Sequence, residues 1–307
     1  MSDIKLFRVH DNSVEELTGQ SVTIEKSLQS MLERHLETFL GVRFLATEYS
    51  TGKKHAGRID TLGIDENNSP VIIEYKRAVN ESVVTQGLFY LDWLLDHKDE
   101  FELMVMRRYG AEVSDVIDWG SPRLLCIAGG FTKFDKHAIQ QIDRNIELYV
   151  YKYYDDRFLL LELINATTAQ TTQVRDNSVS TTTAPRNSKT KTISDYLDQA
   201  DEKVIDRYET LKAYMLALGD EVHIKVVKNY IAFKRIQNFV CLQVHPQTGR
   251  ILLNVKVDPD HITLENGFTR DVRNIGHFGT GNLEIAITSD ADIEKAKHLI
   301  SMAYDVS

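Results

Sequence analysis

The sequence has few cysteines and no pattern typical of a structural metal site. Its 307 residues include only two cysteines, Cys126 and Cys241, which lie far apart and form no CxxC pair. The histidines are scattered without the spacing of metal ligands. These features argue against a disulfide framework or a structural zinc site and fit a reducing compartment, so we expect a cytoplasmic location.

Membrane segments and an excess of positive charge are also missing. No apolar stretch reaches the length of a membrane-spanning helix, and the first residues, MSDIKLFRVHDNS, have no signal-peptide pattern. We therefore expect no membrane partner. The net charge of −9 does not suggest a nucleic-acid-binding protein. Because global charge mainly governs solubility and non-specific attraction, a locally basic groove remains compatible with it.

A polar segment predicts two domains, and the chain is long enough for two separate cores. Residues 165–192, NATTAQTTQVRDNSVSTTTAPRNSKTKT, contain almost nothing that could be buried and predict a flexible linker. Mixed strands and helices in residues 1–164 predict an α/β domain. Residues 193–307 predict an α+β domain with an antiparallel sheet.

Apolar spacing predicts the individual elements. Helical spacing predicts helices over residues 22–40, 82–97, 135–142, 194–218 and 290–304. Apolar runs predict further strands in both domains, among them 42–49, 101–106, 123–128, 146–153 and 158–164.

Residues 57–77, GRIDTLGIDENNSPVIIEYKR, predict two strands joined by a tight turn. The first strand carries Asp60, and the second carries Glu74 and Lys76 on one face, because side chains alternate along a strand. A carboxylate and an ammonium set into an apolar strand are costly unless something compensates them. A divalent metal held between Asp60 and Glu74 would do so, with Lys76 beside the water to be activated.

This arrangement suits metal-assisted phosphodiester hydrolysis. Mg²⁺ and Mn²⁺ favour hard oxygen ligands and often bind through one or two carboxylates. The metal would lower the pKa of a bound water and orient the phosphate, while Lys76 could orient or deprotonate that water or stabilise developing charge. Gln86 and Tyr90 lie four residues apart on the following helix, so they share a face and could position the water, Lys76 or a nucleotide.

The ordered pattern of these residues resembles the PD-(D/E)XK nuclease superfamily. The stretch GRIDTLGIDENNSPVIIEYKR, with QGLFYLDWLL downstream, is similar to the NucS (EndoMS) branch of DNA endonucleases. The resemblance covers residues 22–110 well. It implies a restriction-endonuclease-like mixed central sheet flanked by helices. In NucS proteins the nuclease domain follows a dimerising DNA-binding domain, whereas here it comes first, so mismatch or branched-DNA specificity does not carry over.

The same resemblance implies roles for particular residues. Asp60 and Glu74 become the Mg²⁺ or Mn²⁺ ligands and Lys76 the catalytic lysine, and Gln86 and Tyr90 match accessory catalytic positions. Glu25 matches an acid often found on the first helix, which would make it a further metal ligand. A first-turn acid favoured by the helix dipole explains Glu25 at least as well.

DNA is the partner that this resemblance implies, and a homodimer is left open as the assembly. Lys53, Lys54 and Arg58 precede Asp60 and could contact the DNA backbone, although a solvated basic turn explains them equally. Arg77, directly after Lys76, is a further candidate for DNA contact.

The second domain resembles an uncharacterised domain found in bacterial proteins, often behind nucleases of this kind. Its Gly-rich loop, GHFGTG, leads into a strand rather than a helix, which favours a turn that needs small residues over a phosphate-binding loop. For the whole chain we expect a DNA endonuclease acting in repair or in defence against foreign DNA. The alternative is a non-catalytic DNA-binding or scaffold protein that retains the nuclease fold, and an RNA-directed nuclease is not separated from the first hypothesis.

Overall fold

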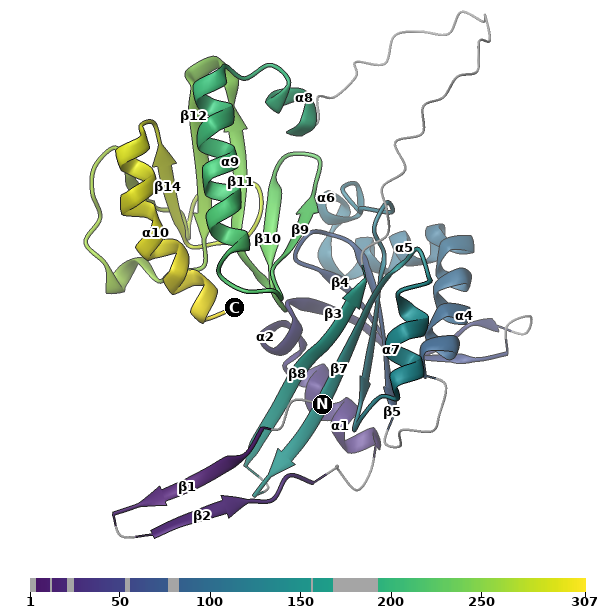
Figure 1. The fold of residues 1–307 in the computed structure, drawn as a ribbon. Coiled ribbons are helices and arrows are strands. Elements are labelled where there is room, and N and C mark those ends of the chain that lie inside the picture. Colours follow the sequence, from purple (N-terminus) through teal and green to yellow (C-terminus); the bar gives the residue numbers. More distant parts are fainter. Residues whose placement is uncertain are drawn as a thin grey trace, which may run out of the picture. The chain divides into compact units, whose positions relative to one another are not determined.

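The computed structural model describes residues 4–11, 13–20, 25–52, 56–76, 83–155, 157–167 and 193–307. The chain divides into two units, Met1–Val174 and Arg175–Ser307 (Figure 1). Most of the expected linker, residues 168–192, lies outside the described residues, as do Lys53, Lys54 and Arg77 and the side chain of Glu25. Within the described part of the chain, no helix is long and apolar enough to cross a membrane.

The first unit is built on a six-stranded sheet in the order β3-β4-β5-β6-β7-β8. β5 pairs in parallel with β6, and β6 with β7, while the remaining pairs are antiparallel. This mixed sheet confirms the expected α/β class. The strands are β3 (Val42–Ser50), β4 (Arg58–Asp65), β5 (Pro70–Lys76), β6 (Arg123–Ala128), β7 (Asn145–Tyr154) and β8 (Phe158–Thr167).

Helices flank both faces of this sheet (Figure 1). α1 (Glu25–Arg34) and α2 (Leu36–Leu40) cover one face, and they replace the single helix expected over residues 22–40 because His35 interrupts it. The other face is covered by α4 (Val83–Asp96), α5 (Lys98–Tyr109) and α7 (Lys133–Ile139), with the short α6 (Ala111–Ser114) after α5. A Cβ atom on Gly87 of α4 would lie 2.4 Å from Leu124 Cδ1, so glycine permits α4 to pack closely on β6.

The expected strand over residues 101–106 is wrong, because this segment is part of α5. Its only buried residues, Phe101 and Val105, lie four apart and therefore on one helical face. Leu103 and Met106 are exposed instead. The run FELMVM has the apolar content of a buried strand, but Glu, Leu and Met are also strong helix formers. Apolar content alone did not distinguish the two.

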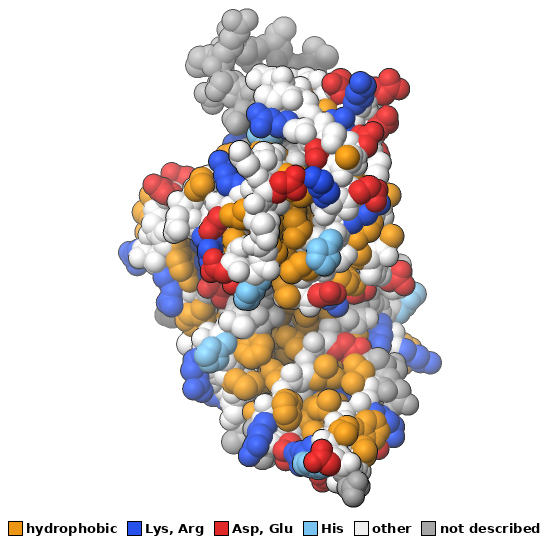
Figure 2. Space-filling model, turned by 90° about the vertical axis from the view of Figure 1, so that its left-hand side faces the viewer, with side chains coloured by type: hydrophobic (Ala, Val, Ile, Leu, Met, Phe, Trp, Pro, Cys, Tyr) orange, Lys and Arg blue, Asp and Glu red, His pale blue; other side chains and the backbone are white. Residues whose placement is uncertain are grey.

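A two-stranded hairpin, β1 (Leu6–His10) and β2 (Ser13–Leu17), precedes α1. Phe7, Val9 and Val14 of the hairpin are exposed large apolar residues. The hairpin lies at the lower end of the view in Figure 1, and Figure 2 shows apolar side chains gathered toward that end. Exposed apolar patches are where partner proteins commonly pack, and a homodimer stays a prediction.

The second unit is an antiparallel sheet with helices, which confirms the expected α+β class. Its strand order is β13-β14-β12-β11-β10-β9. The helix expected over residues 194–218 is two helices, because Asp201 caps the second by accepting the Val204 N–H at 2.9 Å. The elements are α8 (Ile193–Leu197), α9 (Glu202–Leu216), β9 (His223–Val226), β10 (Ile231–Lys234), β11 (Asn238–His245), η1 (Pro246–Thr248), β12 (Arg250–Val255), η2 (Pro259–His261), β13 (Thr269–Asp271), β14 (Leu283–Ile287) and α10 (Asp290–Asp305).

The glycine-rich loop before β14 forms a close turn. Gly279 has a left-handed φ of 84°, and a Cβ atom there would lie 2.5 Å from Cys241 Cβ. Gly281 has a φ of 138° and would place a Cβ atom 2.7 Å from the Val255 nitrogen. Only glycine combines these backbone angles with such close contacts. The structure therefore agrees with a turn that needs small residues.

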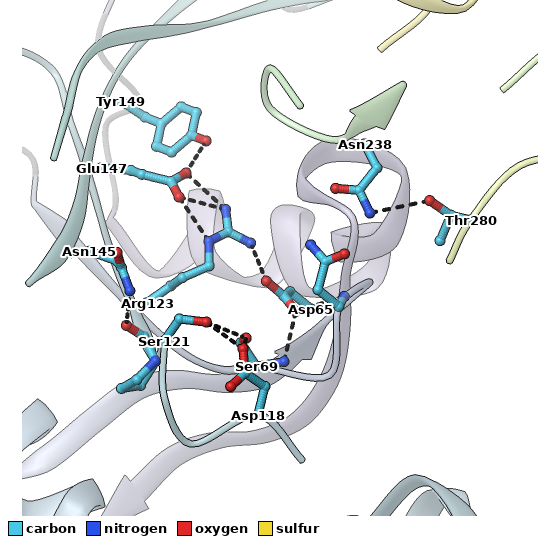
Figure 3. Close-up of polar contacts among 12 residues, drawn as sticks. Asp65, Ser69, Asp118, Ser121, Arg123, Asn145, Glu147, Tyr149, Asn238 and Thr280 are labelled. Carbon is cyan, nitrogen blue, oxygen red and sulfur yellow. Dashed lines mark hydrogen bonds and ion pairs between the residues drawn. The ribbon is translucent and has the colours of Figure 1, made fainter. Parts of the chain in front are cut away.

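A buried ionic network closes the end of the first sheet opposite the Glu74–Lys76 end of β5 (Figure 3). Arg123 is 4% exposed, and its guanidinium bonds Glu147 twice at 2.8 Å and Asp65 once at 3.0 Å. Tyr149 donates its hydroxyl to Glu147 at 2.7 Å. Asp65 also accepts the Ser69 N–H at 2.8 Å, so it caps the turn between β4 and β5. The network thereby ties that turn to β6 and β7.

Replacing Arg123 with methionine is expected to destabilise the first unit strongly. The substitution leaves Asp65 and Glu147 buried without their cation, which typically costs about 3–5 kcal/mol. Urea unfolding followed by tryptophan fluorescence measures this loss, because both tryptophans, Trp93 and Trp119, lie in the first unit. The exposed Arg144, replaced in the same way, serves as the control. A loss below about 1 kcal/mol would contradict the role assigned to the network.

Candidate metal centre

The backbone pairing of β4 with β5 stops where the candidate carboxylates begin. The pairs end at Thr61 and Ile73. One residue further, the Asp60 N–H donates to Glu74 Oε1 at 3.2 Å, and the Tyr75 N–H donates to Asp60 Oδ2 at 3.0 Å. Each carboxylate therefore accepts a backbone N–H from the neighbouring strand. This reciprocal arrangement, the carboxylate clasp, brings together the two acids that the sequence predicted.

Glu74 is an unusual carboxylate because it is fully buried. Its Oε2 atom has no hydrogen-bond partner among the described residues. Burial, followed by the nearby charge of Asp60, raises the pKa of Glu74 to about 9. The Asp60 N–H and the charge of Lys76 act in the opposite direction and are outweighed. With this pKa the carboxyl group is protonated at neutral pH, and a bound cation would favour its ionised form.

The residues present fit a hard divalent cation. Glu74 Oε2 is an orphaned buried oxygen, and Asp60 supplies a second, partly exposed carboxylate. Mg²⁺ usually keeps several waters and binds through one or two carboxylates, so two acids make an adequate ligand set. Within the described residues, no three histidine, cysteine or acidic side chains lie close enough to hold a metal. The role of Glu25 as a third ligand stays a prediction, since its side chain is outside them.

Lys76 ends β5, two residues after Glu74 and on the same face of the strand. Its side chain is partly buried, and its charge lowers the pKa of Glu74. The ammonium therefore lies within electrostatic reach of the carboxylate clasp. The structure does not test its catalytic role.

Gln86 and Tyr90 lie beside the start of β4. The Gln86 amide donates to the Tyr90 hydroxyl at 3.3 Å, and that hydroxyl also accepts the Arg58 N–H at 3.2 Å. A Cβ atom on Gly57 would lie 2.6 Å from the Tyr90 ring, so glycine makes this close approach possible. Among the described residues, neither side chain hydrogen bonds to Glu74. The geometry supports Gln86 and Tyr90 as residues that position β4, and their catalytic role stays a prediction.

Arg58 is exposed and forms an ion pair with Glu48 on β3, with 3.2 Å between its Nε atom and Oε2. Lys26 lies 3.6 Å from the same carboxylate. Part of the positive charge before Asp60 is therefore balanced within the protein. DNA contacts by Arg58, and by Lys53, Lys54 and Arg77 outside the described residues, stay predictions.

A brace of the Asp60 backbone, made by the Gln29 side chain of α1, was not predicted from the sequence. Gln29 of α1 is buried and donates its amide to the Asp60 carbonyl at 2.7 Å and to Thr47 Oγ1 at 3.2 Å. The next strand residue, Thr61, donates its hydroxyl to Glu33 Oε1 at 2.6 Å. Gln29 thus holds the Asp60 backbone where pairing with β5 has stopped. A glutamine next to the buried Leu28 and Leu32 positions was the only signal in the sequence.

Comparisons with known proteins show one full-length relative and one family match. An uncharacterised protein of Haemophilus influenzae is 29% identical over 309 residues, which cover 98% of this chain and 99% of that protein. Residues 193–307 match a domain of unknown function (DUF5655). The match agrees with the uncharacterised domain expected in the second half of the chain.

Two solved structures show a partial likeness. A repair endonuclease from Pyrococcus abyssi is 17% identical, with a TM-score of 0.28 over 43% of this chain and 48% of its own. The EndoMS–dsDNA2 complex is 19% identical, with a TM-score of 0.24 over 47% of this chain and 49% of its own. This chain therefore spans about half the length of each structure. The likeness is too partial to assign a function to this chain.

Glu74→Gln is expected to stabilise the metal-free protein, and to do so more as pH rises. In the unfolded chain Glu74 ionises near 4.5, whereas in the folded state its pKa is about 9. The stability that the neutral carboxyl contributes is complete below pH 4.5 and is lost progressively as pH rises toward 9. A glutamine side chain has nearly the same shape as the Glu74 side chain but cannot ionise. Thermal unfolding in EDTA at pH 5, 7 and 9 should show a growing advantage of the variant.

The exposed Glu112, replaced by glutamine, is the control for this measurement. A stability difference that is constant across the pH range would contradict the raised pKa of Glu74.

Gln29→Leu is expected to weaken binding of Mn²⁺ while the protein still folds. Leucine leaves the Asp60 carbonyl without its donor, and an unsatisfied buried acceptor costs about 1–3 kcal/mol. Asp60 would then be held less firmly. Titration calorimetry with Mn²⁺ measures the affinity, and Gln29→Glu tests the donor separately because it keeps the shape. The exposed Gln141→Leu is the control. Unchanged Mn²⁺ affinity in both Gln29 variants would refute the brace.

Proposed function

We propose that the first unit is a Mg²⁺- or Mn²⁺-dependent endonuclease that hydrolyses phosphodiester bonds in DNA. The observation that carries this proposal is the carboxylate clasp, in which buried Glu74 keeps one oxygen without a partner beside Asp60. A buried acid with a strongly raised pKa beside a second acid is destabilising, and such pairs concentrate at functional sites. Lys76 on the same strand completes the set of groups that phosphodiester hydrolysis needs.

Each residue has a role in this scheme. Asp60 and Glu74 would hold the ion, which when bound would supply Lewis-acid activation of water and of the phosphate. Lys76 orients or deprotonates the attacking water, or stabilises the charge that develops on the phosphate. The backbone N–H groups of the clasp fix both carboxylates in advance of binding, so little rearrangement is needed.

The biological setting that suits this activity is DNA repair or defence against foreign DNA, with the second unit recognising nucleic acid or a partner. The competing proposal is a DNA-binding or scaffold protein that retains the nuclease fold without catalysis. The burial of Glu74 favours catalysis, because a protein that only binds DNA gains nothing from an unbalanced acid in its core. A neutral residue at this position would make such a protein more stable.

A cleavage assay tests the proposal directly. The protein is incubated with single-stranded, duplex, mismatched and branched DNA and with RNA, in Mg²⁺, Mn²⁺ or EDTA. Cleavage is expected with either metal and not in EDTA. Asp60→Asn, Glu74→Gln and Lys76→Met are each expected to lower the rate by roughly two orders of magnitude or more, since each removes a charged group from the reacting centre.

Arg144→Met, exposed and remote from the carboxylate clasp, is the matched control for these variants. Cleavage that continues in EDTA or in all three variants would refute the mechanism. Tight DNA binding without cleavage of any substrate would favour the scaffold protein. Deleting residues 193–307 then shows whether the second unit sets the choice of substrate.

A further inference from the structure

A cationic cavity lies at the free edge of the first sheet, beside strand β3. Its volume is about 400 Å³, it is open to solvent, and it is lined by α1, α2, the start of β3 and the end of α5. We call it the β3-edge cavity. Three arginines, a histidine and two aromatic residues are prominent in its lining: Arg34, His35, Arg43, Phe44, Arg108 and Tyr109.

Two of the arginines lie over aromatic rings of the lining. The Arg43 guanidinium carbon lies 5.1 Å from the centre of the Tyr109 ring. The Arg108 guanidinium carbon lies 5.0 Å from the centre of the Phe44 ring and 6.0 Å from that of the Tyr109 ring. The Tyr109 hydroxyl donates to the Phe44 carbonyl at 2.7 Å, which holds the end of α5 against β3. These contacts favour one placement of both cations before a ligand binds.

Few of the N–H donors of these arginines are used within the protein. A guanidinium has five N–H donors, and a contact with an aromatic ring does not occupy them as a hydrogen bond does. Arg43 donates one hydrogen bond to Asn68 Oδ1 at 2.8 Å. Arg34 donates one from Nε to the Ser30 carbonyl at 3.0 Å. Arg108 is exposed and forms no hydrogen bond within the described residues. The remaining donors match the geometry of phosphate oxygens.

The positive charge in the cavity is not balanced by ion pairs. In the part of the chain that the structure describes, Arg34, Arg43 and Arg108 form no ion pair. Two glutamates, Glu33 and Glu37, also line the cavity, so with His35 neutral the three arginines leave a single net positive charge in the lining. An excess of cations in one cavity of a chain with net charge −9 favours an anionic ligand.

The cavity lies toward the end of β4 that carries Asp65, because its lining residue Val42 pairs with Asp65, and the candidate metal centre lies toward the other end of that strand. Phe44 pairs with Gly63, which is three residues from Asp60 on β4, or about 10 Å along the strand. Phosphates repeat about every 3.4 Å along each strand of a duplex. A DNA strand that runs from the metal centre along β4 to this end of the sheet would bring phosphates to the cavity.

We infer that the β3-edge cavity binds backbone phosphates of the DNA a few nucleotides from the bond that is cut. The inference rests on the proposed function, because the ligand is DNA. The cavity supplies affinity and sets the path of the strand, while Asp60, Glu74 and Lys76 perform the chemistry. Contacts with phosphates carry no base information, so they suit binding that is independent of sequence.

The experiment measures DNA binding in EDTA, where metal-dependent cleavage does not interfere. Fluorescence anisotropy with labelled single-stranded and duplex oligonucleotides is recorded over a series of salt concentrations. The double variant Arg34→Ala/Arg108→Ala, in the full chain, is expected to bind about tenfold more weakly at low salt, for every sequence. The slope of log K against log salt should fall by about two, one for each lost phosphate contact.

The matched control is Arg107→Ala/Arg144→Ala, which removes the same charge from exposed positions outside the cavity lining. Thermal unfolding verifies that both double variants fold. Should Arg34→Ala/Arg108→Ala fail to fold, the exposed single substitution Arg108→Gln takes its place, with about half the effect on the salt slope.

Equal losses in the two double variants, unchanged binding in Arg34→Ala/Arg108→Ala, or a parent protein that binds no DNA would each overturn the inference. Two further results distinguish failure of this inference from failure of the proposed nuclease function. Cleavage by the parent with binding that does not depend on the cavity arginines refutes the cavity alone. Binding that depends on them, without cleavage in any metal, refutes the nuclease and leaves the cavity in place.

Discussion

The rest of the candidate centre depends on two carboxylates, each of which accepts a backbone N–H from the neighbouring strand. Asp60 and Glu74 stand where the pairing of β4 with β5 ends, and each accepts an N–H from the other strand. The Asp60 carbonyl accepts a hydrogen bond from the Gln29 amide of α1. The carboxylates are therefore fixed by the backbone, and Glu74 is buried with its charge uncompensated.

Buried acids at the two ends of the same sheet differ in how their charge is compensated. At one end, Asp65 and Glu147 are paired with the buried cation Arg123. At the other end, Glu74 keeps an oxygen without a partner among the described residues, and Lys76 only partly offsets its charge. The first arrangement is complete within the protein, whereas the charge of the second is removed by a proton or, in the proposed nuclease, would be offset by a bound cation. This difference is the reason for proposing a functional role for Glu74 and a structural one for Arg123.

The helix α5 supplies two residues of the inferred DNA-binding cavity, Arg108 and Tyr109. As a strand over residues 101–106, this segment would have ended two residues before Arg108, the first of its residues that line the cavity. As a helix it continues to Tyr109, and its last turn brings Arg108 and Tyr109 beside the start of β3. The basic residues that the sequence suggested lie around residues 53–58 and 77, near Asp60 and Lys76 in the chain. The β3-edge cavity instead joins residues that are far apart in sequence.

The sequence by itself determined the two-strand unit around Asp60, Glu74 and Lys76, and the α/β and α+β classes of the two halves. These follow from alternation and from a short turn, which are local properties of the backbone. Only the tertiary structure decided that residues 101–106 are helical, that Gln29 braces Asp60, and that three arginines share a cavity. Burial, desolvation and counter-charge depend on which distant segments pack together, so no local pattern encodes them.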